Sequence, residues 1–293
     1  MEGMQLLGWT DTTLSDPIDA AVSNELKTTA IVRRFLPLYP KWYKNTVPAD
    51  TIIISDGVLT IDQSATNSIS EIQAPFTLEK SQIDEEAMAG YVLTGAIRTA
   101  NLVAQAEDRI LLQGKNALTD PFFKKITVKN RPIDDGLMSN PDQSVPVPLL
   151  DAAIADEYGN NTARAVARAY AVLQENGHYG PYALVLPTLA YADFITPLNR
   201  SAIIPAELMK WIVTTPDMTK VHFYGTGALP ADIGILLSFG GNTMDLVMSS
   251  EMNAVTLVSA PTGTQYPFIV HEYLALRLKD KSAVVQLKFA QKA

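Results

Sequence analysis

The amino-acid sequence predicts an α+β fold in which an extended β-hairpin, a long helix and a mixed block of helices and strands follow one another. Three observations lead to this prediction. Asp56-Gly57 separates two short runs rich in β-branched residues, residues 84–113 repeat apolar positions at helical spacing, and the second half of the chain mixes helical with strand-like runs. A period near 3.6 residues indicates helices, whereas short β-branched or alternating runs indicate strands.

A short N-terminal helix is predicted from its start signal and its apolar face. Asp16-Pro17 combines an N-cap residue with a proline at the first helical position. Ile18, Val22 and Leu26 then recur at four-residue steps, which places them on one side of a helix. The polar residues 1–15 are expected to be mobile until a partner holds them.

An extended hairpin follows the N-terminal helix. Residues 51–55 and 58–61 are rich in isoleucine, valine and leucine and flank Asp56-Gly57. Asp-Gly between two such runs is a strong hairpin signal, because both turn residues adopt positive φ. The apolar residues of this hairpin have little local core to join, so we expect a neighbouring subunit to cover them.

The long helix is predicted over residues 84–113. Asp84, Glu85 and Glu86 put negative charge into its first turn, where the helix dipole favours it. Apolar residues then recur at three- and four-residue steps up to residue 110. Such a helix is about 45 Å long, although Gly90 and Gly95 each weaken it by about 1 kcal/mol. A helix of this length is expected to serve as a structural spine.

The second half of the chain contains shorter elements. Residues 162–174 carry a helical apolar stripe, and residues 182–186 form an apolar strand-like run. Glycine and asparagine at 240–242 and charged residues at 279–281 each separate two strand-like runs. These two turns predict two further hairpins.

The composition limits the classes of function. Charged residues make up 18% of the 293 residues, below the average of about 25%, so we expect apolar surface to be covered in contacts between copies. A net charge of -8 argues against a protein whose main task is binding nucleic-acid phosphates. The absence of cysteine excludes disulfides and thiolate sites. No apolar run approaches the roughly 20 residues of a membrane span, so no membrane partner is expected.

No group of residues predicts catalysis, and no cofactor or metal site is expected. The three histidines, His178, His222 and His271, have no acidic or histidine partner at the spacing of metal ligands. Gly225 and Gly227 hint at a dinucleotide-binding loop, but Pro230 stands where the third glycine is required, so a turn is the better interpretation. A sugar- or nucleotide-handling enzyme remains the alternative from another class, supported only by the glycine turns.

Several segments together resemble the encapsulin (linocin-type) shell proteins and the related major capsid proteins of tailed phages. Each segment is weak alone, but they are scattered over most of the chain in the same order. The segments are Lys27 to Arg34, Ile72 to Leu78, Ala106-Glu-Asp-Arg-Ile-Leu-Leu-Gln-Gly114, Gly177-His-Tyr-Gly-Pro-Tyr-Ala-Leu-Val-Leu186, Glu272-Tyr-Leu-Ala-Leu-Arg-Leu278 and Ala283 to Leu287.

The resemblance implies the Hong Kong 97-like capsid fold and a structural shell protein that is not an enzyme. In such a shell, apolar residues of the hairpin and the spine become buried only on assembly. The expected segments are an N-terminal arm and short helix at 1–35, an extended loop with the hairpin at 36–80, a peripheral domain at 81–145 with the spine helix at 84–113, an axial domain at 146–255, and C-terminal strands at 256–293 that return to the peripheral domain.

Two branches of this superfamily are open. The helix after Asp16 lacks the tryptophan common in encapsulins, and residues 39–50 depart from the encapsulin loop. The favoured prediction is therefore a major capsid protein of a tailed bacteriophage, located in a virion that is assembled in the host cytoplasm and encloses double-stranded DNA without sequence-specific binding. The alternative is an encapsulin shell that encloses a cargo enzyme in a bacterial or archaeal cytoplasm.

The expected partners are other copies of the chain, in pentamers and hexamers of a closed shell, with portal, scaffold or decoration proteins as further candidates. A basic cluster after the spine is interpreted as a solvated face, with intersubunit contacts or weak nucleic-acid contacts as its functional alternatives. The candidate intersubunit residues are Ile52, Ile54, Asp56, Gly57, Val58 and Ile61 in the hairpin, and Lys124, Lys125, Lys129 and Arg131 in the basic cluster.

Overall fold

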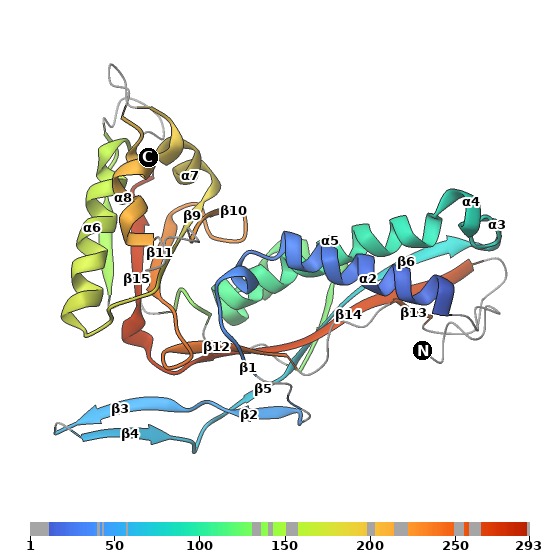
Figure 1. The fold of residues 1–293 in the computed structure, drawn as a ribbon, viewed down its shortest axis with the longest axis horizontal. Helices are drawn as coiled ribbons and strands as arrows, with labels where there is room; N and C mark the ends of the chain where they lie inside the picture. The colour runs from blue at the N-terminus through green and yellow to red at the C-terminus, as the bar shows by residue number, and fades with distance from the viewer. Residues whose placement is uncertain are drawn as a thin grey trace.

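The computed structural model has two layered bodies set at an angle, with a thin β-hairpin that projects from their junction (Figure 1). Helices and sheets are both present throughout, which confirms the predicted α+β class. No helix in the described part of the chain is long and apolar enough to cross a membrane. The structure describes residues 12–39, 42, 44–56, 58–130, 136–139, 143–150, 158–197, 203–213, 222–248, 255–257 and 265–291.

The first body contains a long, mostly antiparallel sheet in the order β1-β12-β14-β6-β7, with β13 paired to β14. Its centre is the pairing of β14 with β6, which runs from Gln265 opposite Glu79 to Leu274 opposite Ser70. The strands are β1 (Leu38–Tyr39), β6 (Ser70–Glu79), β7 (Thr127–Lys129), β12 (Met244–Met248), β13 (Val255–Leu257) and β14 (Gln265–Leu278).

Two helices, α2 (Thr12–Thr29) and α5 (Tyr91–Gln113), pack on each other, and α5 packs on β6 and β14. The predicted face of α2 is confirmed, because Ile18, Val22 and Leu26 are buried. Many of the buried residues on α5 are alanines, whose small side chains allow close packing against neighbouring elements. The short helix η1 (Val32–Arg34) follows α2, and the short helices η2 (Gly114–Thr119) and η3 (Pro121–Lys125) follow α5.

The predicted start of the N-terminal helix is wrong. The helix α2 begins at Thr12, so Pro17 lies inside it instead of at its first position. Pro17 lies past the first turn of α2, where it removes one main-chain donor, and the helix nevertheless continues to Thr29.

The predicted single helix over 84–113 is also wrong in its first turns. Gly90 has a left-handed φ of 61° and separates α3 (Lys80–Asp84) and α4 (Glu86–Ala89) from α5. The carboxylate of Glu86 accepts the N–H groups of Val92 at 2.5 Å and Leu93 at 3.1 Å, so the expected acidic start caps a later helix. The spine helix α5 is therefore about 35 Å long.

The second body is a five-stranded sheet in the order β10-β9-β11-β15-β8, with α6, α7 and α8 on one face. Strand β9 is buried along its whole length because the other face packs on the core that contains the spine. The predicted helix at 162–174 and strand at 182–186 are confirmed. The elements are β8 (Ser144–Val147), α6 (Asn160–Glu175), β9 (Tyr182–Pro187), α7 (Thr188–Ile195), α8 (Pro205–Val213), β10 (Phe223–Thr226), β11 (Ile233–Ser238), η4 (Lys281–Ala283) and β15 (Val284–Phe289).

The two hairpins predicted at 240–242 and 279–281 are wrong. At each position the chain leaves one sheet and enters the other. At 240–242 it passes from β11 in the five-stranded sheet to β12 in the long sheet, and at 279–281 it returns from β14 in the long sheet to β15 in the five-stranded sheet. The two crossings are adjacent, because the N–H groups of Lys279 and Asp280 both donate to the carbonyl oxygen of Thr243. A local turn signal is the same whether the chain folds back in its own sheet or passes into another.

The two sheets divide the chain differently from the expected segments. Strands β1 and β6, expected in the extended loop at 36–80, belong to the long sheet, as do β12 and part of β13 from the segment at 146–255. Of the strands in 256–293, β14 returns to the spine, whereas β15 lies in the five-stranded sheet. Long-range strand pairing, which local sequence patterns do not encode, determines this division.

Candidate intersubunit arm and its anchor

The hairpin predicted around Asp56-Gly57 is present as β3 (Thr51–Ser55) and β4 (Val58–Asp62), here called the hairpin arm. Within the described part of the chain these two strands pair only with each other, and the arm projects from the two bodies (Figure 1). Asp56 has the positive φ of 51° that the turn requires. At its base, β2 (Thr46–Pro48) and β5 (Thr66–Ser68) form a second small ribbon.

The hairpin arm carries exposed aliphatic side chains. In its register Ile52 lies opposite Ile61 and Ile54 lies opposite Leu59. Because side chains alternate along a strand, Ile52, Leu59 and Ile61 share one face, and Ile53 and Val58 lie on the other. Val58, Leu59 and Ile61 are each about 60% exposed. An isolated two-stranded hairpin is at best marginally stable in water, so we expect a partner to cover the exposed aliphatic side chains of the arm.

The structure therefore places the predicted residues Ile52, Val58 and Ile61 in the strands of the arm, with Asp56 exposed at its turn. Gly57 and the side chain of Ile54 lie outside the described residues. Sequence reasoning missed Ile53 and Leu59, although strict alternation along the two strands identifies Leu59 as a neighbour of Ile61 on the same face.

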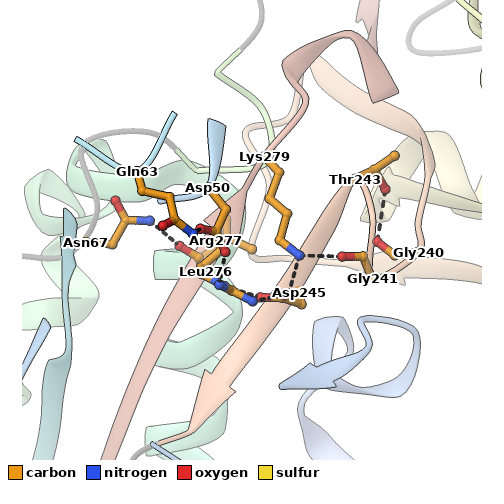
Figure 2. Close-up of polar contacts among 10 residues, drawn as sticks. All are labelled: Asp50, Gln63, Asn67, Gly240, Gly241, Thr243, Asp245, Leu276, Arg277 and Lys279. Carbon is orange, nitrogen blue, oxygen red and sulfur yellow. Dashed lines mark hydrogen bonds and ion pairs between the residues drawn. The ribbon is translucent and has the colours of Figure 1, made fainter. Parts of the chain in front are cut away.

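The anchor of the arm is a buried group of charges centred on Arg277 (Figure 2). Arg277 is 2% exposed, and its Nε and Nη2 donate to the two carboxylate oxygens of Asp245 at 2.7 and 2.6 Å. Its Nη1 donates to Asp50 Oδ2 at 2.5 Å, and its guanidinium lies 4.0 Å from the centre of the Tyr39 ring. Lys279 Nζ completes the group 2.8 Å from Asp245 Oδ2. We call Asp50, Asp245, Arg277 and Lys279 the Arg277 network.

The charges of the Arg277 network balance, with two cations and two carboxylates. Burial disfavours the charged form of Arg277, but the hydrogen bonds and charge of Asp245, together with Asp50, outweigh it and raise its pKa above the ordinary value. Lys279 also donates to the carbonyl oxygen of Gly241. A buried ion pair needs this degree of hydrogen bonding to offset the cost of removing charges from water.

A second group of buried charges joins the segment that follows α2 to the spine helix and to β14. Arg33 donates to Glu107, with Nη2 at 2.7 Å from Oε2, and also to Glu272. The Asp108 carboxylate accepts the main-chain N–H groups of Ile31 and Val32. Burial, followed by the charge of Glu107, raises the pKa of Asp108 to about 7. These contacts hold the end of α2 in place.

The residues of the predicted basic cluster lie in two different elements. Lys124 and Lys125 are exposed at the end of η3, whereas Lys129 lies in β7, with its Nζ 3.6 Å from Glu71 Oε2. Arg131 lies outside the described residues. The glutamate beside Lys129 offsets part of the positive charge expected there.

The described residues include no group of three or more histidine, aspartate or glutamate side chains that could hold a metal ion. A polar cavity of about 220 Å³ lies between the spine helix and the turn after β10, and is lined by Asp108 and Arg109 among others. Arg109 already donates to Asp120 and to the carbonyl oxygens of Gln105 and Gly227. The glycines at 225 and 227 line this cavity as the end of a strand and the start of a turn.

Comparison with known families places the chain among shell-forming proteins. The model of the Linocin M18 family, described as "Encapsulating protein for peroxidase", matches residues 11–121 and 136–268. The chain belongs to this family. The Linocin M18 match spans the spine helix, the hairpin arm and most of both sheets.

Individual relatives agree with the Linocin M18 assignment. A type 1 encapsulin shell protein, EncA from Myxococcus xanthus, is 29% identical over 127 residues, which cover 43% of this chain and 42% of the relative's length. The match thus spans less than half of that curated relative. The crystal structure of a virus-like particle from Pyrococcus furiosus superposes with a TM-score of 0.67 at 15% identity, covering 94% of this chain and 100% of that chain. A Gordonia phage Cozz structure gives 0.55 at 11% identity, covering 89% and 87%.

The comparisons establish the Hong Kong 97-like fold, which encapsulins and phage capsids share, and confirm the resemblance predicted from the sequence. The chain is therefore a member of a shell-forming family. The sequence matches support the encapsulin alternative better than the favoured prediction of a phage major capsid protein, because the family model and the curated relative are both of the encapsulin type.

Proposed function

We propose that the chain is an encapsulin-type shell protein, whose copies assemble into a closed shell around a protein cargo. The observation that carries this proposal is the projecting hairpin arm, on which four aliphatic side chains are exposed: Ile53, Val58, Leu59 and Ile61. Membership of the Linocin M18 family supports the encapsulin type of shell.

The arm supplies a physical reason for assembly. Val58, Leu59 and Ile61 are each more than half exposed, so a neighbouring copy that covers them removes aliphatic surface from water. Such burial contributes on the order of 1 kcal/mol for each half-exposed side chain. A shell repeats the contact in every subunit, so a modest contribution per arm stabilises the whole assembly.

The proposal of a protein cargo rests on the family match. The net charge of -8 argues against a shell that binds nucleic acid by charge, and it is compatible both with a protein cargo and with a genome that is packaged by a motor. The family is described by the encapsulation of a peroxidase, so an enzyme of that class is the first cargo to test. Packaged DNA, the content expected of a phage capsid, is the competing outcome.

The test is to purify the particles from the source cells, treat them with nuclease and identify their contents. Electron microscopy and light scattering should show closed particles in the megadalton range, and proteomics should find one enriched protein besides the shell. A stable monomer at high protein concentration would contradict assembly. Nuclease-protected double-stranded DNA in place of protein would support the phage interpretation and reject the encapsulin one.

Replacing residues 51–61 by a Gly-Ser linker tests the role of the arm. We expect a folded subunit that no longer forms closed shells, because the linker removes the exposed strands and leaves both bodies intact. Normal shells from this variant would show that the arm is not the intersubunit contact.

A further inference from the structure

The entry of the chain into the hairpin arm is held in an unusual backbone conformation. Asp50, the residue immediately before β3, has a left-handed φ of 52°. A residue other than glycine rarely adopts this conformation, although aspartate and asparagine tolerate it better than most. It persists where the surrounding structure fixes it. The backbone direction at Asp50 determines where the arm points.

Both legs of the arm meet at the Asp50 side chain. Its Oδ2 accepts from Arg277 at 2.5 Å, and its Oδ1 accepts from Gln63 Nε2 at 2.7 Å (Figure 2). Gln63 immediately follows β4, so one carboxylate ties the incoming leg to the outgoing leg and ties both to β14. A main-chain bond adds to this, because the N–H of Ile52 donates to the carbonyl oxygen of Lys279 at 2.9 Å.

Arg277 is itself immobilised on the body. Its two bonds to Asp245 fix the plane of the guanidinium, and the Tyr39 ring covers one face. Asp245 belongs to β12, the neighbour of β14, so the network spans two paired strands of the long sheet. The only member of the Arg277 network that comes from the arm side is Asp50, whose side chain is 21% exposed.

We propose that the Asp50–Arg277 ion pair sets the direction in which the hairpin arm leaves the body, and that both residues are positioning residues for shell assembly. This inference rests on the proposed function. A closed shell forms only if each copy presents its contact within a narrow range of angles, because the rotation between neighbours must close. An arm that swings at its base still offers its aliphatic surface, but at a range of angles.

The test compares Asp50→Asn with Asp62→Asn. Asparagine has the shape of aspartate and tolerates a left-handed backbone, so Asp50→Asn removes the charge that Arg277 binds and leaves the backbone preference unchanged. Asp62 lies at the same end of the arm, and its carboxylate accepts the N–H of Ser64 outside the Arg277 network. Asp62→Asn therefore removes the same charge and keeps an acceptor oxygen for Ser64.

For Asp50→Asn we expect a broadened distribution of particle masses and diameters by mass photometry and electron microscopy. Amide exchange at residues 52–62 of unassembled subunits should be about tenfold faster, while exchange in the two sheets is unchanged. Asp62→Asn should match the wild type in both measurements. Equal particles and equal exchange for Asp50→Asn, Asp62→Asn and the wild type would overturn the inference.

Arg277→Lys is a second variant, which changes the partner of Asp50 that lies in the body. A lysine keeps the charge but cannot bind two carboxylates with the planar geometry of a guanidinium. Faster exchange in the arm with an unchanged spine helix would support the inference, whereas an arm as protected as in the wild type would contradict it. If the wild type itself forms no shell, the proposed function fails, and the exchange data on unassembled subunits still test the ion pair.

Discussion

Asp108 Oδ1 accepts the main-chain N–H of Val32 at 2.9 Å, across 76 positions of sequence. The same carboxylate accepts the N–H of Ile31, so the segment that follows α2 is hydrogen-bonded to a side chain of the spine helix. Arg33 of this segment donates to Glu107 and Glu272, and Arg34 also lies near Asp108. The attachment of the N-terminal helix therefore depends on buried charges as well as on apolar packing.

This attachment should depend on pH. Burial and the charge of Glu107 raise the pKa of Asp108 to about 7, well above its value of 3.8 in an unfolded chain. The folded state therefore holds the proton more tightly, and the free energy of unfolding should fall as pH rises toward the folded pKa. The expected loss is about 2 kcal/mol between about pH 5.5 and pH 7.5. Amide exchange of residues 17–36, corrected for the intrinsic effect of pH, measures it.

Asp108→Asn is the control for the pH prediction. The amide oxygen can still accept from Ile31 and Val32, but it does not titrate, so the protection of α2 should no longer decline over this range. Glu107 and Glu272 remain opposite Arg33 in this variant. An unchanged pH dependence would show that Asp108 is not the group responsible for it.

Substitutions in the hairpin arm should separate assembly from folding. Ile61→Ser exchanges an aliphatic side chain that is 60% exposed in the subunit. We therefore expect the melting temperature of the unassembled subunit to change little and the yield of closed particles to fall sharply. Light scattering and thermal denaturation measure the two effects on the same sample.

Val58→Ser tests the opposite face of the arm. Val58 is as exposed as Ile61, but alternation places it on the other side of the ribbon. Because the proposed contact covers Val58 as well as Leu59 and Ile61, we expect Val58→Ser to lower the particle yield too. Normal assembly of this variant would restrict the contact to the face of Ile52, Leu59 and Ile61. Loss of assembly in both variants would indicate that the arm is enclosed on two sides.

Leu26→Ala should destabilise the subunit itself. Leu26 is fully buried where α2 packs on the spine helix, and removal of a buried leucine side chain costs about 2–5 kcal/mol. Lys27→Ala, at the next position on the exposed face of the same helix, should cost less than about 0.5 kcal/mol. Denaturant unfolding of unassembled subunits compares the two, and equal losses would contradict the packing described for α2.

Charge reversal in the basic cluster should disturb assembly if those residues make intersubunit contacts. The variant carries glutamate at Lys124, Lys125, Lys129 and Arg131, and the control carries glutamine at the same four positions. Reversal should reduce the particle yield more than neutralisation does, because like charges at a contact repel. Equal particle yields from both variants would support the alternative interpretation, in which these four side chains form a solvated face.

Features that depend on neighbouring residues could be predicted from the sequence. Asp56-Gly57 specified the turn of the hairpin arm, and the spacing of Ile18, Val22 and Leu26 specified the buried face of α2. In each case a local preference agrees with the final fold, so tertiary packing did not override it.

Features that depend on distant partners could not be predicted. Asp50 and Arg277 are 227 positions apart, and nothing near either residue in the sequence indicates the other. The same limit explains the two missed crossings between the sheets. The charged Arg277 inside an apolar strand run was the one available signal, because a buried arginine is almost always paired.

The two crossings that meet beside Thr243 also affect how the subunit unfolds. The consecutive strands β12, β13 and β14 belong to the long sheet, whereas β11 before them and β15 after them belong to the five-stranded sheet, and one apolar core joins both bodies. The strands of each sheet come from several separate segments of the chain, so no continuous fragment contains one sheet alone. We therefore expect the two bodies to melt in one cooperative transition, and neither body can be excised as an independent folding unit.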